Sequence, residues 1–165
     1  MKKIIFIRHG RAEDHSPDIP DFERSLTGKG KDITRLMARK LKEKEKDIGL
    51  LVTSPAFRAI ETALIFAGEY DINPESIVIK SSIYFRFDER SFLEMVKSIN
   101  ESVATITLFG HNPSFTELAG HFSKETFDNI PKSGIVSLTF KVMTWSEIRR
   151  NTASESLFLK PKNLL

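Results

Sequence analysis

Residues 3–10, KIIFIRHG, decide the fold of this chain, because a short run of large apolar residues ends there in arginine, histidine and glycine. Such a run is typical of a strand that is buried on both faces of a sheet. Charged side chains at the end of a buried strand favour a ligand at that end. We therefore predict that Arg8 and His9 lie at a binding site at the carboxyl end of the first strand.

The composition is that of an ordinary globular protein. The chain has 165 residues, of which 40% are hydrophobic and 28% charged, so we predict a single domain over residues 1–165. A net charge of +3 is too small to indicate a nucleic-acid partner, and the lack of cysteine excludes disulfides and thiolate chemistry. No apolar segment has the length of a signal peptide or membrane span. We expect a cytoplasmic monomer that binds neither nucleic acid nor a membrane.

Apolar runs of strand length alternate with segments of helical periodicity along the chain. We predict strands over 3–7, 48–53, 76–80, 104–109, 134–142 and 155–159, and helices over 28–47, from 54 onward, over 88–99 and from 113 onward. This alternation predicts a three-layer α/β/α sandwich with a largely parallel central sheet. The last strands have no long helix between them, so we expect antiparallel pairing at one edge, as in a phosphoglycerate mutase-like fold.

Two of the predicted helices have the same start signal. Ser54-Pro55 and Asn112-Pro113 each follow a strand, and both place a favoured N-cap before a proline at the first helical position. Helical spacing also predicts the buried face of three helices. These faces are Ile33, Leu36, Met37 and Leu41; Phe57, Ile60, Leu64 and Ala67; and Phe115, Leu118, Ala119 and Phe122.

The ends of three predicted strands carry the chemistry. Arg8 and His9 end the first strand, Arg58 follows the second by a few residues, and His111 follows the strand over 104–109. Ligands of open α/β sheets bind at the carboxyl ends of the strands. If these strands are neighbours, two arginines and two helix N-termini surround a phosphoryl group, and a neutral histidine can attack its phosphorus. Gly10 would let the chain turn tightly beside the anion.

Each of these residues also has a purely structural interpretation. His9 could be a hydrogen-bonded histidine at a strand end, Arg8 a surface cation and His111 a helix cap. A metal site is disfavoured because the two arginines would repel a cation. His15 in a polar loop and His121 late in a helix have no such context, and we interpret both as structural or exposed.

Four motifs together are more specific than any one residue. They are "RHG" after the first strand, "LTGKG" at 26–30, "TSPAFRAIETA" at 53–63 and "GHNPSFTELA" at 110–119. In order and spacing they resemble the histidine phosphatase superfamily over nearly the whole chain. The short length, "PKSGIVSLTF" and the closing "LFLKPKNL" resemble its compact branch, typified by phosphohistidine phosphatases of the SixA type.

The resemblance implies a role for five residues. His9 matches the nucleophile, Arg8 and Arg58 the phosphate-binding arginines, and His111 the second histidine, which stabilises the charged transition state. Arg24 stands where many relatives have a further arginine that reaches the substrate. The resemblance implies neither a metal nor an organic cofactor. It also implies a double displacement, in which His9 attacks phosphorus and water then hydrolyses the phosphohistidine.

A general acid is not evident in the sequence. Glu13, Asp14, Asp88 and Glu89 are the candidates, but loop positions and an N-cap at Asp88 explain them as well. Phosphohistidine needs no strong acid, because its imidazole leaving group has a pKa near neutrality. We therefore expect a phosphohistidine-bearing protein as substrate. A small-molecule phosphomonoesterase is the alternative, and an inactive phosphate-binding module is a third.

Overall fold

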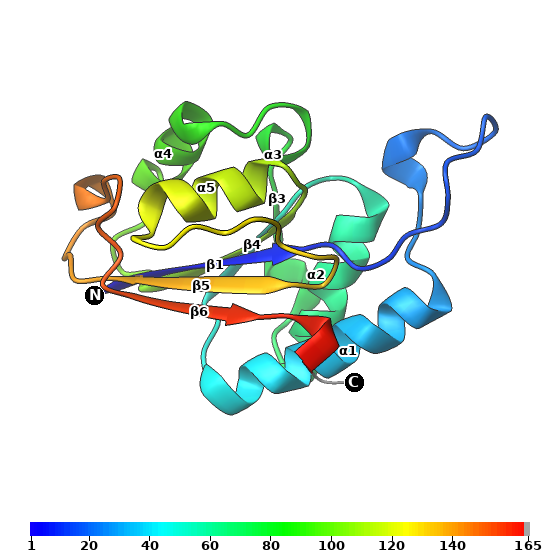
Figure 1. The fold of residues 1–165 in the computed structure, drawn as a ribbon, viewed down its shortest axis with the longest axis horizontal. Helices are drawn as coiled ribbons and strands as arrows, with labels where there is room; N and C mark the ends of the chain where they lie inside the picture. Colours follow the sequence, from blue (N-terminus) through cyan, green and yellow to red (C-terminus); the bar gives the residue numbers. More distant parts are fainter. Residues whose placement is uncertain (164–165) are drawn as a thin grey trace.

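The computed structural model describes residues 1–163 and consists of one six-stranded sheet between two layers of helices (Figure 1). The strands are β1 (Lys2–Arg8), β2 (Leu50–Thr53), β3 (Val78–Ile79), β4 (Thr105–Gly110), β5 (Ile135–Phe140) and β6 (Glu155–Leu159). The helices are α1 (Gly28–Lys44), α2 (Phe57–Glu69), α3 (Ser82–Phe85), α4 (Glu89–Lys97) and α5 (Ser114–Phe122), with short 3-10 turns η1 (Asp21–Glu23), η2 (Pro74–Ser76), η3 (Trp145–Glu147) and η4 (Pro161–Asn163).

The strand order is β3-β2-β4-β1-β5-β6. The first four strands in this order are parallel, whereas β5 pairs antiparallel with β1 and β6 antiparallel with β5. The predicted sandwich with an antiparallel edge is therefore confirmed. The order also makes β2, β4 and β1 adjacent, which was the condition for a shared site at their ends.

The side chains of β1 alternate between the two hydrophobic cores of the molecule, one on each face of the sheet. Ile4 and Phe6 belong to the core beneath α4 and α5, whereas Ile5 and Ile7 belong to the core beneath α1 and α2. Figure 1 shows these helix pairs on opposite faces of the sheet. The unbroken apolar run of β1 is thus explained by burial on both faces.

Two predicted helix starts are wrong. Helix α2 begins at Phe57 rather than at Ser54-Pro55, and the Ser54 hydroxyl accepts the Ala56 N–H before the helix begins. Helix α5 begins at Ser114, and the amide of Asn112 instead donates to Asn129 and to the Ile130 carbonyl. In both cases the presumed cap side chain is used in a contact beside the helix end.

The predicted buried face of α2 is wrong at Phe57 and Leu64, although Ala67 is buried as predicted. Phe57 and Leu64 are 43% and 44% exposed, and the buried face contains Arg58, Thr62 and Phe66 instead. The helix is rotated so that Arg58 points toward the sheet edge, and Phe57 then packs edge-on against Phe22 near η1. Leu36 of α1 is likewise 46% exposed, whereas Met37 and Leu41 are buried as predicted. The predicted face of α5 is confirmed.

The segment between β1 and α1 extends beyond the carboxyl end of β1 (Figure 1). It carries η1 and two isolated bridges, Ala12 with Leu26 and Ser16 with Ile19. This arm brings Asp21 and Arg24 to the edge of the sheet where the predicted site lies. No helix of residues 1–163 has the length and apolarity needed to cross a membrane.

Candidate active site

A pocket of about 400 Å³ lies at the carboxyl ends of β1 and β4. In the parallel register Arg8 of β1 stands beside Gly110 of β4, so His9 and His111 follow at the same level. The residues that line the pocket are Arg8, His9, Asp21, Arg58, Tyr84, Phe85, His111 and Asn112. The structure therefore brings together four of the five predicted site residues.

His9 is held in one orientation by its own backbone. The ring is only 8% exposed, and its Nδ1 atom lies 2.7 Å from the Gly10 carbonyl oxygen. A carbonyl can only accept a hydrogen bond, so Nδ1 carries the proton and Nε2 keeps its lone pair. Burial, with further contributions from His111 and the two arginines, lowers the pKa of His9 to about 3. The side chain is therefore a neutral imidazole at physiological pH.

His111 faces His9, with 5.1 Å between the ring centroids. Its Nε2 atom lies 2.8 Å from the Ser54 hydroxyl, and burial beside Arg58 lowers its pKa to about 4. The Ser54 oxygen also accepts the Ala56 N–H, which leaves it able to donate to Nε2 or to accept from it. The other ring nitrogen of His111, Nδ1, is buried and has no partner among residues 1–163.

The two arginines are anchored by one end of each guanidinium group. Nη1 of Arg8 donates to the Ile130 carbonyl at 2.9 Å, and Nη1 of Arg58 donates to the Asp21 carbonyl at 2.7 Å. The Nε atoms of both are buried and have no partner within the described part of the chain. Together with His111 Nδ1, they are three buried nitrogens without a partner in the described part of the chain, all on residues that line one pocket.

Sequence reasoning did not find Asp21 and Tyr84. Arg58 Nη2 lies 3.0 Å from Asp21 Oδ2, and the Tyr84 hydroxyl donates to the same oxygen at 2.8 Å. Burial opposes ionisation of Asp21, but hydrogen bonds from Tyr84, Arg24 and Arg58 outweigh it and hold its pKa well below the usual range. The pocket thus contains one ionised carboxylate, which no motif or spacing indicated.

Arg24 does not line the pocket. Its Nε and Nη2 atoms donate to Asp21 Oδ1 at 3.1 and 2.8 Å, and its Nη1 atom donates to the Glu13 carbonyl. The structure therefore places it behind Asp21, where it orients that carboxylate. The expectation that Arg24 itself reaches the substrate does not match this position.

The four candidate acids lie elsewhere. Asp88 caps α4 by accepting the Ser91 N–H, Glu89 pairs with Arg150, and Glu13 and Asp14 are exposed. None of them lines the pocket. The capping interpretation of Asp88 is thus confirmed.

The fold and the pocket define the class of this protein: a three-layer α/β protein with basic and imidazole side chains gathered at the carboxyl edge of its sheet. Residues 4–113 match the family model of the histidine phosphatase superfamily, branch 1. The chain belongs to the histidine phosphatase superfamily.

The similarity to known proteins extends over nearly the full length of this chain. An uncharacterized protein of Picosynechococcus sp. is 30% identical over 99% of both chains. The protein histidine phosphatase SixA complexed with tungstate superposes with a TM-score of 0.78 at 24% identity, over 99% of both chains. A putative phosphohistidine phosphatase SixA from Nakamurella multipartita gives 0.79 at 15% identity, covering 97% of this chain and 96% of the other. These two structures establish likeness of fold.

Proposed function

We propose that this protein is a phosphatase that works through a phosphohistidine on His9 and removes the phosphoryl group from phosphohistidine in a partner protein. The observation that carries the proposal is the pair of buried guanidinium donors without a partner, Arg8 Nε and Arg58 Nε, on residues that line one pocket with the neutral His9. Guanidinium groups in such a pocket require acceptors, and phosphoryl oxygens supply them. Family membership supports the same chemistry.

In the first step the Nε2 lone pair of His9 attacks phosphorus. A P–N bond forms to Nε2 while the bond from phosphorus to the leaving group breaks, and the leaving group takes the electron pair. The ring then carries a positive charge, which the hydrogen bond from Nδ1 to the Gly10 carbonyl stabilises. Arg8, Arg58 and His111 hold the phosphoryl oxygens, so catalysis rests on positioning and electrostatics.

In the second step water attacks the phosphorus of the phosphoenzyme. The P–Nε2 bond breaks, its electrons return to His9, and inorganic phosphate leaves with the proton balance completed by solvent. The low pKa of His9, about 3, favours this return to the neutral imidazole. The enzyme thereby regains its starting state without a cofactor in either step.

The leaving group supports the assignment to phosphohistidine. Asp21 is the carboxylate that lines the pocket, and because its pKa is low it is ionised and a poor proton donor. An alkoxide needs a proton as it departs, whereas an imidazole protonated beforehand leaves as a neutral molecule. A pocket without a protonated acid therefore favours phosphohistidine over alkyl phosphates.

The test compares substrates and a variant. A histidine peptide phosphorylated with phosphoramidate and a panel of phosphomonoesters are assayed for kcat/KM, and the phosphoenzyme is trapped as an acid-labile phosphoprotein. We expect preference for the peptide and no labelling in His9→Ala, whereas His121→Ala, which changes a histidine that pairs with Glu89 outside the catalytic pocket, should be labelled like the parent.

Three outcomes contradict the proposal in different ways. Preference for the monoesters would show that the substrate is a small phosphomonoester and not a phosphohistidine protein. Hydrolysis by His9→Ala at the parental rate would show that His9 is not the nucleophile. Phosphate binding without turnover of any substrate would make the chain a phosphate-binding module.

A further inference from the structure

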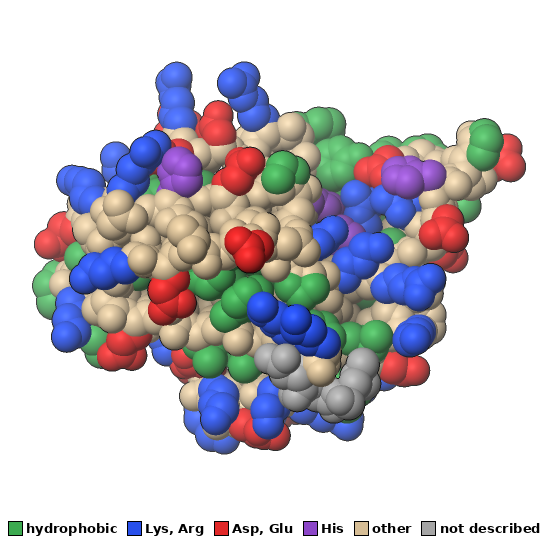
Figure 2. All heavy atoms as spheres, viewed as in Figure 1, with side chains coloured by type: hydrophobic (Ala, Val, Ile, Leu, Met, Phe, Trp, Pro, Cys, Tyr) green, Lys and Arg blue, Asp and Glu red, His purple; other side chains and the backbone are tan. Residues whose placement is uncertain are grey.

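A second pocket, of about 520 Å³, adjoins the catalytic pocket and is strongly basic. Its lining residues are Arg8, Asn129, Pro131, Lys132, Lys160, Pro161 and Lys162. Arg8 lines both pockets, so they share a wall. Lys and Arg side chains gather beside the histidines on the face shown in Figure 2. The second pocket holds four positive charges and no carboxylate among its lining residues.

The lysines of this pocket lack acidic partners in the described part of the chain. Within residues 1–163, none of Lys132, Lys160 and Lys162 forms an ion pair with Asp or Glu. Several other exposed cations are paired, for example Arg39 with Glu69 at 3.0 Å. Clustered like charges repel one another, and this repulsion is relieved by a bound anion.

Local contacts fix the position of this cluster relative to His9. Lys132 immediately precedes Ser133, whose N–H donates to the Arg8 and His9 carbonyls at 3.1 Å. The Nζ atom of Lys160 lies 4.5 Å from the centre of the Phe158 ring, which packs edge-on against Phe127. Lys132 is therefore tied to the end of β1, and Lys160 is placed by its contact with Phe158.

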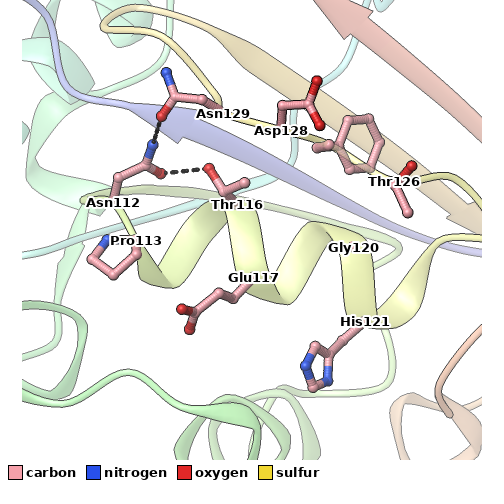
Figure 3. A pocket seen from close by; sticks show the side chains of 10 residues that line it. Asn112, Pro113, Thr116, Glu117, Gly120, His121, Thr126, Asp128 and Asn129 are labelled. Carbon is pink, nitrogen blue, oxygen red and sulfur yellow. Dashed lines mark hydrogen bonds between the residues drawn. The ribbon is translucent and has the colours of Figure 1, made fainter.

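A groove that adjoins both the catalytic pocket and the basic pocket has the reverse charge. A groove of about 680 Å³ along α5 is lined by Glu117 and Asp128 and continues from Asn112 of the catalytic pocket (Figure 3). A hydrogen bond of 2.8 Å between Asn112 and Asn129 lies where this groove meets the basic pocket. The positive potential of the basic pocket and the negative potential of the groove would together orient a substrate that has acidic groups beside its phosphoryl group. Its acidic groups would lie over the lysines.

We propose that the basic pocket is a second anion-binding subsite, and that it binds a carboxylate of the protein that carries the phosphohistidine. The proposal rests on the function proposed above. Arg8 connects the two subsites, so the carboxylate and the phosphoryl group belong to one substrate. A protein partner fits because Phe85, which lines the catalytic pocket, is 77% exposed and offers an apolar contact that a small phosphate ester would not use.

The first experiment measures binding without catalysis. A fluorescein-labelled peptide with a histidine between glutamates is titrated with the protein, and anisotropy gives its Kd. Each Lys→Gln change should weaken binding about two- to fivefold, and Lys132→Gln/Lys160→Gln/Lys162→Gln about tenfold or more. Binding should also weaken with added salt.

Matched controls separate this subsite from general charge. Lys44, Lys46 and Lys141 are exposed lysines outside the pocket, and their triple Gln variant removes the same charge. We expect it to bind the peptide like the parent. The corresponding Lys→Arg triple at 132, 160 and 162 keeps the charge and should retain binding, and thermal unfolding of the Lys→Gln triple like the parent excludes misfolding as the cause of its loss.

The second experiment measures selectivity. The same peptide, phosphorylated on histidine, is compared with one whose glutamates are replaced by glutamines, and the ratio of their kcat/KM values is recorded. The parent should prefer the acidic peptide about tenfold, and the Lys→Gln triple at 132, 160 and 162 should lose this preference while the control triple keeps it.

The outcomes distinguish the two proposals. If no phosphohistidine peptide is hydrolysed, the proposed function fails, and the anisotropy result still decides the subsite. Equal loss of binding in both triples, or no difference between acidic and neutral peptides, overturns the subsite. Displacement of the labelled peptide by propane-1,3-diyl bisphosphate but not by the unlabelled acidic peptide would assign the pocket to a second phosphate of a small molecule, and would also overturn it.

Discussion

Arg58 Nη2 lies 3.0 Å from Asp21 Oδ2, so the arginine assigned to the phosphoryl group already holds a carboxylate of the arm between β1 and α1. The Arg58 Nη1 atom is bound to the backbone carbonyl of the same residue. Asp21 therefore does two things: it fixes the guanidinium group, and it places a negative charge beside the anion site. The first effect favours phosphate binding and the second opposes it.

Asp21→Asn should separate these effects. The amide oxygen can still accept from Arg58 and the backbone contact is unchanged, but the charge is gone. Removal of one like charge at a distance of a few ångströms is worth about 1 kcal/mol in a solvated site, so we expect the Kd of inorganic phosphate to fall about fivefold. Isothermal titration calorimetry measures it. Asp88→Asn changes an N-cap outside the pocket and serves as the control; weaker phosphate binding by Asp21→Asn would show that the carboxylate is needed.

Ser54→Ala tests the orientation of His111. The Ser54 hydroxyl lies 2.8 Å from His111 Nε2, so its removal lets the imidazole rotate or change tautomer. Loss of one such hydrogen bond costs about 1 kcal/mol, which corresponds to a decrease of about fivefold in kcat/KM. Ser137→Ala is the matched control, because Ser137 is also buried but lies on β5 away from the pocket. The same decrease in both variants would contradict a specific role.

The two histidines predict how stability depends on pH. Their pKa values in the folded protein are about 3 for His9 and about 4 for His111, against an ordinary value near 6.5. Between about pH 4 and 6.5 the unfolded chain binds protons that the folded chain does not, so stability falls as the pH falls. Each histidine contributes a slope of up to about 1.4 kcal/mol per pH unit in this window.

Urea unfolding at pH 7, 6 and 5 measures this slope. The variant His9→Gln/His111→Gln should show a clearly smaller loss of unfolding free energy over the range than the parent. Asp21 does not interfere, because a carboxylate with a depressed pKa changes stability only below its unfolded value near 3.8. If the unfolding free energy of parent and variant fell equally with pH, the two histidines would not be the cause of the pH dependence.

Gly30→Ala should destabilise the protein. Gly30 lies in the first turn of α1, and a Cβ atom there would be 2.1 Å from the Arg11 carbonyl oxygen, so the segment after His9 and the helix would have to move apart. Backbone clashes of this kind cost about 1–3 kcal/mol. Gly68→Ala in α2 meets nothing within 4 Å and should be neutral or stabilising, by up to about 1 kcal/mol. Thermal unfolding of the two variants decides the comparison.

Local signals predicted most of the fold. Apolar runs located all six strands of the described sheet, and β6 was predicted with its observed bounds. The predicted faces failed on α2, where Phe57 and Leu64 are exposed. A hydrophobic pattern assumes that a helix buries its most apolar side, but α2 is turned so that Arg58 reaches the pocket. The single domain over residues 1–165 stays a prediction.

Gly10 has a role in the packing of the fold that the sequence did not predict. A tight turn beside an anion was the expected use of this glycine. In the structure its missing Cβ makes room for α1, since an added Cβ would lie 2.5 Å from Thr34 Oγ1. The packing of the strand end against the helix therefore requires glycine here, and the close approach to an anion stays a prediction.

The sequence by itself determined which residues follow the strand ends, and so it singled out Arg8, His9, Arg58 and His111 as candidates for one site. It did so because short apolar runs are local properties of the chain, whereas the strand order that makes β1, β2 and β4 neighbours is tertiary. Only the tertiary structure decided the rest of the pocket: Asp21 meets Arg58 across 37 positions and Tyr84 across 63. Such contacts depend on how the arm and α3 pack onto the sheet edge, and no periodicity of the sequence encodes that packing.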